Sequence, residues 1–155
     1  MHMEEIIGGL EGLNICKGVF RGYALYITNE RVIGAKMKSR GKELFKFLMG
    51  WRGSVRGNLR PLEWRGESLK VSRLSAEETS TLLEDIRGRI DFEVRKQEIE
   101  KVELKKPGTF RAGHVKIKAR GGEHKVLIVA GAREEYEYLK GLFKEFCPEK
   151  VEVIE

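Results

Sequence analysis

The chain has 155 residues, the size of one ordinary domain; 41% of them are hydrophobic, 35% are charged and three are prolines. This composition excludes an intrinsically disordered chain, and every apolar run is far shorter than the roughly 20 residues of a membrane-spanning helix. Lys and Arg number 30 against 24 Asp and Glu, so the formal net charge is +6. The acidic side chains are almost all Glu, a bias typical of thermophilic proteins. We expect a single soluble domain over residues 1–155, with an insertion at about residues 38–90.

Residues 18–37 form two β-rich runs that meet at Asn29 and Glu30. Asn tolerates the left-handed backbone of a tight turn, so these runs predict a β-hairpin. The pairs that this register predicts are Ile27 with Val32, Tyr26 with Ile33, Leu25 with Gly34, and Ala24 with Ala35. Both faces of the hairpin are then largely apolar, and we expect another segment to cover the outer face.

Two helices bracket the second half of the chain. Ser75 and Glu78 have the spacing of a capping box, which predicts a helix over about residues 76–87. A second helix is predicted over about residues 132–146. Its apolar stripe should face the core and close the sheet, and consists of Tyr136, Leu139, Phe143 and Phe146.

Residues 91–103 and 109–129 are a second β-rich block. The run from Arg120 to Glu123 has Gly at both central positions, a strong signal for a two-residue hairpin turn. That turn places Ile117 opposite Val126 and Val115 opposite Ile128 on the core face, and Lys118 opposite Lys125 on the other face.

The charge is concentrated in one part of the chain. Residues 36–70 contain ten basic and three acidic side chains, a local net charge of +7, so the rest of the chain is at −1. Guanidinium groups bind phosphate oxygens in pairs, and Trp lies well at a lipid headgroup interface or stacks on a base. The candidate anion-binding residues of this basic segment are Arg52, Arg56, Arg60, Arg65, Lys42, Lys46, Trp51 and Trp64.

A structural role for the same segment is the alternative. Phe45, Leu48, Trp51 and Trp64 would fold over the outer face of the first hairpin and leave the arginines in solvent. The two interpretations are compatible, with aromatic rings inward and arginines outward.

Signals for catalysis, metals or redox chemistry are missing. The only thiols, Cys16 and Cys147, form no C-x-x-C pair and are expected to be free thiols of a cytoplasmic protein. His114 and His124 are predicted on opposite faces of their hairpin, which argues against a shared metal. There is no phosphate-binding loop or nucleophile elbow. We therefore expect no enzyme, no cofactor and no metal site. The N-terminus lacks a signal peptide, so the expected location is the cytoplasm, at most peripheral to a membrane.

The order of hairpin, insertion, β-rich block, Gly-Gly hairpin and closing helix resembles the pleckstrin-homology-like (PH-like) superfamily, and especially its GRAM and bacterial PH-like members. The resemblance covers about residues 18–37 and 92–146. The matching residues are Gly22, Leu25, Ile27, Thr28, Asn29, Arg31, Val32 and Ile33, then Ile99, Val102, Val115, Ile117, Gly122, Leu139 and Leu142. It implies an α+β fold in which a bent, partly open antiparallel barrel is capped by the C-terminal helix. The long basic insertion and the helix near Ala76 depart from that plan.

The sequence thus predicts a non-catalytic PH-like binding module whose basic segment engages an anionic phospholipid surface or a protein partner. A nucleic-acid-binding protein is one alternative, because positive charge with Arg and Trp is also an electrostatic signature for RNA. A self-associating structural module is another, because bacterial PH-like domains, which this chain resembles, often form homo-oligomers.

Overall fold

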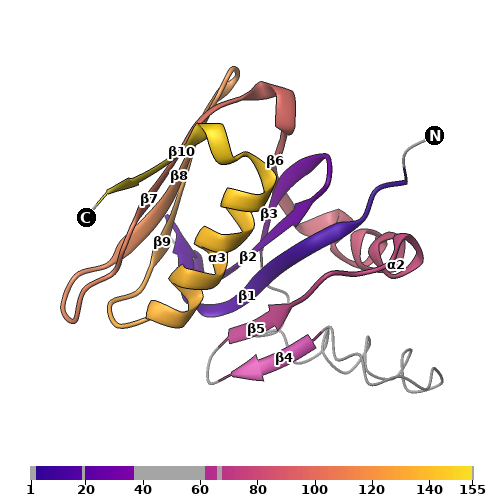
Figure 1. The fold of residues 1–155 in the computed structure, drawn as a ribbon. Coiled ribbons are helices and arrows are strands. Elements are labelled where there is room, and N and C mark those ends of the chain that lie inside the picture. Colours follow the sequence, from indigo (N-terminus) through magenta and orange to yellow (C-terminus); the bar gives the residue numbers. More distant parts are fainter. Residues whose placement is uncertain (1–2, 19, 37–61, 66–67, 155) are drawn as a thin grey trace.

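The computed structural model describes residues 3–18, 20–36, 62–65 and 68–154, which form ten strands, two α-helices and three short 3₁₀ turns (Figure 1). The strands are β1 (Ile6–Lys17), β2 (Phe20–Thr28), β3 (Arg31–Lys36), β4 (Leu62–Arg65), β5 (Ser68–Val71), β6 (Ile90–Arg95), β7 (Ile99–Lys105), β8 (Gly113–Ala119), β9 (Gly122–Ile128) and β10 (Val151–Ile154). The helices are α2 (Ala76–Ile86) and α3 (Arg133–Phe146), and the 3₁₀ turns are Arg87–Arg89, Lys96–Glu98 and Pro148–Lys150.

All ten strands belong to one large sheet. Its main path runs β10-β7-β8-β9-β1-β2-β3-β6, and the β4–β5 hairpin joins β1 beside this path. β1 therefore has three partners, which are β2, β5 and β9. The two ends of the path, β10 and β6, do not pair with each other, so the sheet is open within the described ranges. The α+β class and the partly open sheet agree with the sequence prediction.

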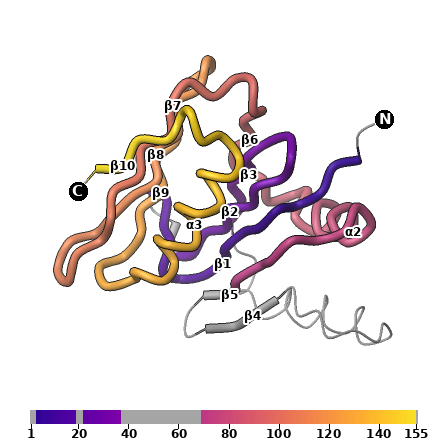
Figure 2. Tube along the Cα trace, in the orientation of Figure 1, coloured from indigo at the N-terminus to yellow at the C-terminus, as the bar shows by residue number. Residues whose placement is uncertain are grey.

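One pair of strands departs from the antiparallel sheet that we predicted. β10 runs parallel to β7, with Val151 opposite Val102 and Ile154 opposite Lys105. The cause is α3, which carries the chain back across the sheet after β9, so the next strand starts at the end where β7 starts (Figure 2). The short β10 was not predicted, although three of its four residues are β-branched.

The first hairpin, β2 and β3, has the predicted register. Ile27 lies opposite Val32, Tyr26 opposite Ile33, Leu25 opposite Gly34, and Ala24 opposite Ala35. The Thr28 hydroxyl accepts hydrogen bonds from the backbone N–H groups of Glu30 at 2.9 Å and Arg31 at 3.0 Å, which fixes the turn.

The register predicted for the second hairpin, β8 and β9, is wrong by two residues. Ile117 lies opposite His124 instead of Val126, and Val115 lies opposite Val126 instead of Ile128, because Arg120 and Gly121 form the turn and Gly122 begins β9. A shift of two keeps the same side chains on the core face, as predicted. It also places Lys118 opposite Glu123, and Lys116 opposite Lys125.

Both helices form close to their predicted bounds. The capping box of α2 is present, with the Glu78 N–H donating to Ser75 at 3.1 Å and the Ser75 N–H donating to the Glu78 carboxylate at 2.8 Å. α3 begins one residue later than predicted, and its predicted stripe is buried throughout: Tyr136, Leu139, Phe143 and Phe146.

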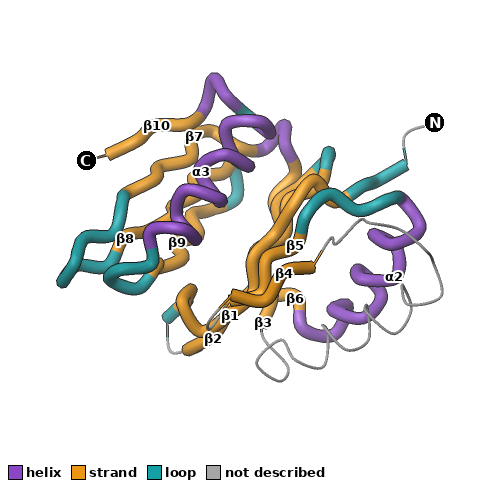
Figure 3. Tube along the Cα trace, turned by 60° about the horizontal axis from the view of Figure 1, so that its bottom comes forward, coloured by secondary structure: helices purple, strands orange, loops and turns teal. Residues whose placement is uncertain are grey.

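Two hydrophobic cores lie on opposite faces of β1, β2 and β3. α3 lies on one side of these strands and α2 on the other (Figure 3). The larger core lies between these strands, the strands β7, β8 and β9, and α3. The smaller one covers the outer face of the first hairpin, where Ala24, Tyr26, Ile33 and Ala35 pack against β5 and α2 through Leu69, Val71, Leu74, Leu82 and Ile86. A cover over this face was expected, and among the described residues it consists of β5, α2 and the connection between them. Phe45, Leu48 and Trp51, the other proposed cover, lie outside the described residues.

Candidate functional site

The structure describes only the flanks of the predicted basic site. Arg52, Arg56, Arg60, Lys42, Lys46 and Trp51 lie outside the described residues. Trp64 and Arg65 form the end of β4, opposite Leu69 and Ser68 of β5, and β5 in turn pairs with β1. At its start, the basic segment leaves the sheet at the end of β3, where Lys36 lies opposite Tyr23. Both flanks are therefore fixed to the central strands of the sheet.

A polar cluster lies near the end of β3 and joins three strands. Asp91 of β6 accepts a hydrogen bond from Lys17 of β1 at 2.7 Å and another from the Tyr23 hydroxyl of β2 at 2.6 Å, both on Oδ2. Sequence reasoning did not select these residues, which are widely separated along the chain. The one available signal was that Asp91 is one of only two aspartates.

An aromatic stack extends the cluster across the open side of the sheet. Phe92 of β6 stacks on His124 of β9, with ring centroids 4.2 Å apart and planes 6° apart. The Lys17 ammonium lies 5.3 Å from the centroid of the Phe92 ring. Burial and the nearby Lys17 charge lower the pKa of His124, so its ring is neutral at pH 7. Side chains thus bridge β6 and β9, two strands with no backbone pairing to each other in the described sheet.

The charges and hydrogen bonds of this cluster stabilise the contact between its strands, and we call Lys17, Tyr23 and Asp91 the clamp. Burial opposes the charge of Asp91, but the hydrogen bonds from Lys17 and Tyr23 outweigh it and lower the pKa of the carboxyl. Burial and the hydrogen bond to Asp91 raise the pKa of Tyr23 well above its usual value. The carboxylate is therefore ionised with its charge matched by Lys17, and the phenol stays protonated. The arrangement holds β1, β2 and β6 together where the basic segment begins.

Replacing Asp91 by Asn should lower the free energy of unfolding at pH 7 by about 1 kcal/mol, because the ion pair with Lys17 is lost while Tyr23 keeps an acceptor. The pKa of Asp91 is lower in the folded than in the unfolded chain. The contribution of Asp91 to the free energy of unfolding is therefore fully present above its unfolded-state pKa. It is lost as the pH falls through its folded-state pKa. Denaturant unfolding at neutral and acidic pH measures this.

The control for that experiment is Glu84→Gln, since the Glu84 side chain is 73% exposed in an ion pair with Arg87. This control should leave the unfolding free energy nearly unchanged at both pH values. A difference between wild type and Asp91→Asn that stays constant down to acidic pH would contradict the ion-pair assignment.

A second buried polar group lies in the smaller core. Glu11 of β1 is 1% exposed and accepts a hydrogen bond of 2.5 Å from the Tyr26 hydroxyl. Burial raises the pKa of Glu11, although the Tyr26 hydrogen bond and the Arg89 charge oppose that shift. Arg89 itself bonds Asp85 at 2.9 Å and the Lys36 carbonyl at 3.0 Å, so it also ties α2 to the end of β3.

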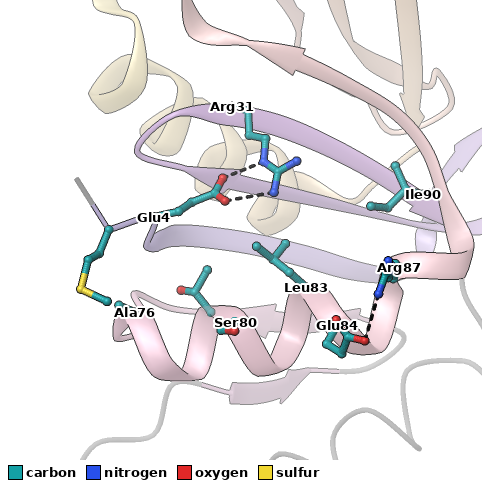
Figure 4. A pocket seen from close by; sticks show the side chains of 10 residues that line it. Glu4, Arg31, Ala76, Ser80, Leu83, Glu84, Arg87 and Ile90 are labelled. Atoms are coloured by element: carbon teal, nitrogen blue, oxygen red, sulfur yellow. Dashed lines mark hydrogen bonds and ion pairs between the residues drawn. The ribbon is translucent and has the colours of Figure 1, made fainter. Parts of the chain in front are cut away.

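A groove of about 610 Å³ runs between the N-terminal segment, β3 and α2, and is lined in part by Met3, Leu83, Arg87 and Ile90 (Figure 4). Its central cation is Arg31, whose guanidinium donates to both Glu4 oxygens at 2.7 and 3.0 Å and pairs with Glu93 at 2.7 Å. One guanidinium thus faces two carboxylates. This groove does not have the charge of an anion site.

His114 and His124 occupy opposite faces of the sheet, as predicted. His114 lies on the outer face with Nε2 2.8 Å from Glu103, and this hydrogen bond is the main cause of the lowered pKa of Glu103. Within the described ranges, no three His, Cys, Asp or Glu side chains are arranged to hold a metal. Both cysteines are free thiols, and burial raises the pKa of Cys147 to about 11, which keeps it protonated at neutral pH.

Compared with known proteins, the chain matches no family model, no curated protein and no solved structure. In the described part of the chain, neither helix is long and apolar enough to cross a bilayer.

Proposed function

We propose that this chain is a non-catalytic, PH-like binding module that engages an anionic phospholipid surface through its basic segment, residues 36–70. The strand order supports the PH-like part of the proposal. A four-strand meander, β1-β2-β3-β6, continues into a three-strand meander, β7-β8-β9, whose last strand pairs with β1. α3 follows directly and packs on the larger core. The insertion with β4, β5 and α2, and the added β10, are this chain's own features.

One observation carries the functional part: the outer face of the first hairpin already has a cover. Tyr26 and Ile33 are fully buried in a cluster that also contains Leu69, Leu82 and Ile86 of β5 and α2. Covering that face was the structural role proposed for the aromatic side chains of the basic segment. Because β5 and α2 take part in that cover, the proposal assigns Trp51 and the arginines around it to a ligand.

The charge distribution supports an anionic partner. The basic segment contributes +7 to a chain whose other residues sum to −1. Each Lys or Arg near an anionic membrane gains on the order of 1 kcal/mol, and the attraction decays within a Debye length.

Changing Arg52, Arg56 and Arg60 together to Ser should weaken binding to phosphatidylserine-containing vesicles by about a hundredfold, at roughly 1 kcal/mol per arginine. Wild-type binding should itself weaken steeply with salt. Co-sedimentation measures both. The matched control changes Arg87, Arg120 and Lys144 to Ser, three exposed cations elsewhere, and should retain most of the binding. Equal losses in the two triple variants would point to net charge alone and contradict the assignment.

The same variants distinguish the alternatives. A nucleic-acid-binding protein would bind RNA in a filter assay and would not bind vesicles. Its RNA binding should weaken with salt and be lost in the Arg52, Arg56 and Arg60 triple variant. Insertion at a headgroup interface blue-shifts Trp fluorescence on vesicles, whereas stacking on bases quenches it on RNA. A light-scattering mass above that of one chain, with no binding of either target, would favour self-association.

A further inference from the structure

The loop between β7 and β8 exposes an aromatic ring at its tip. Phe110 is 94% exposed, whereas the other large exposed hydrophobic residues in the described ranges are Met3 at 66%, Val153 at 38% and Leu127 at 37%. The loop extends away from the body of the molecule in two views, beside the connection from β9 to α3 (Figures 1 and 3). A phenyl ring has no hydrogen-bonding group, so full exposure to water leaves its entire apolar area unburied.

The loop that carries Phe110 is held in place at its base. The Gly108 N–H donates to the Arg111 carbonyl at 2.9 Å, which closes a tight turn around Phe110. The Gly131 N–H, from the connection before α3, donates to the Gly108 carbonyl at 2.8 Å. Pro107 is buried. The exposed ring is therefore displayed by an anchored turn, which reduces the entropy that binding would cost.

Cations flank the ring on both sides. Lys106 and Arg111 are exposed and Lys105 is half-buried, and Arg133 is exposed at the start of α3, next to the connection that bonds Gly108. Glu134 and Glu135 follow Arg133 in the first turn of α3, and Glu135 is hydrogen-bonded to Asn14. The loop itself, residues 105–112, contains three cations and no carboxylate, so it is positively charged.

We infer that the β7–β8 loop is a second membrane contact, in which Phe110 inserts at the headgroup boundary of an anionic bilayer while Lys106 and Arg111 bind lipid phosphates. This rests on the lipid partner proposed above but uses a different element of the chain. A lipid surface suits the loop better than a protein does. One ring is far smaller than the roughly 800 Å² per partner of a stable protein interface, whereas insertion into a bilayer requires no complementary surface.

The test compares Phe110→Ala with Met3→Ala in co-sedimentation with phosphatidylserine-containing and with pure phosphatidylcholine vesicles. Phe110→Ala should weaken binding to the anionic vesicles by about tenfold, since the ring's burial is lost, and Met3→Ala should not. A single-tryptophan reporter, F110W with W51F and W64F, should shift its emission to the blue on the anionic vesicles. The paired change Lys106→Ser with Arg111→Ser should weaken the same binding and make it less sensitive to salt.

The outcomes separate this inference from the proposed function. If Phe110→Ala binds anionic vesicles as strongly as the wild type, the role of the loop is overturned. It is also overturned if the tryptophan reporter binds the vesicles without a blue shift of its emission. If the arginine triple abolishes binding and Phe110→Ala does not, the basic segment alone is the membrane site. The reverse result supports the loop and contradicts the segment. A wild-type chain that binds no anionic vesicle overturns both. A loss of self-association in Phe110→Ala with vesicle binding unchanged overturns the membrane role of the loop and leaves the proposed function standing.

Discussion

Replacing Phe143 by Ala should lower the free energy of unfolding by about 3–5 kcal/mol. Phe143 is fully buried in α3, within the core that α3 shares with β1, β2 and the strands β7, β8 and β9. Truncation removes the ring's burial and leaves a cavity that the surrounding strands cannot fill, because each is held by backbone pairing on one side or both. The midpoint of denaturant unfolding, measured with an unchanged slope, gives the value.

Phe110→Ala is the matched control for this change, since it removes the same atoms from a side chain that is 94% exposed. It should change the unfolding free energy by less than about 0.5 kcal/mol. A Phe143→Ala midpoint equal to that of Phe110→Ala would contradict the packing of α3 on the sheet.

Adding one methyl group at Gly113 should also lower the free energy of unfolding, by about 1–3 kcal/mol or more. A Cβ there would lie 2.2 Å from the Lys105 carbonyl oxygen and 2.5 Å from the Pro107 nitrogen, both backbone atoms at the base of the β7–β8 loop. Backbone atoms cannot rotate away as a side chain can, so either the loop or the end of β8 must shift. Denaturant unfolding of Gly113→Ala reports the cost.

Gly141 provides the opposite case with the same chemical change. It lies in α3, and a Cβ there would meet nothing within 4 Å. Gly141→Ala should therefore stabilise the chain by roughly 0.5–1 kcal/mol, because Ala has the higher helix propensity. If Gly113→Ala leaves the midpoint unchanged or raises it, as Gly141→Ala should, the close backbone approach at Gly113 is wrong.

The elements that the sequence predicted well are those with local signals. The Asn29 turn and the alternation of Tyr26 with Ile27 determine the first hairpin and its register. Ser75 and Glu78 determine where α2 begins, because both partners of the capping box lie within one helical turn. In each case the deciding contacts join residues that are close along the chain.

Contacts between distant residues decided what could not be predicted. The turn of the second hairpin has two adjacent glycines, and glycine permits more than one turn position, so the turn alone leaves the register open. β10 is a strand only because β7 offers a free edge beside it. The clamp of Lys17, Tyr23 and Asp91 exists only once β1, β2 and β6 meet.

For the candidate site, the sequence identified the basic segment by charge, while the exposed Phe110 was visible only in the structure. Phe110 lies in a short run with Pro107 and Gly108, where a buried ring and an exposed ring produce the same pattern. The ring is exposed because the loop is anchored at Gly108 and Gly113. The pattern of apolar residues in the sequence does not reveal this anchoring.

β1 also sets the order in which the chain can complete its fold during synthesis. The strand contributes Ile6 to the smaller core and Ile15 to the larger one. As the chain emerges from the ribosome, β2 can pair with β1 at once, and the smaller core closes when β5 and α2 follow. Ile15, however, meets its partner Ile128 only after nearly the whole chain has been made. The face that α3 finally covers therefore stays uncovered longest, which makes it the surface where a nascent chain of this protein is most open to aggregation.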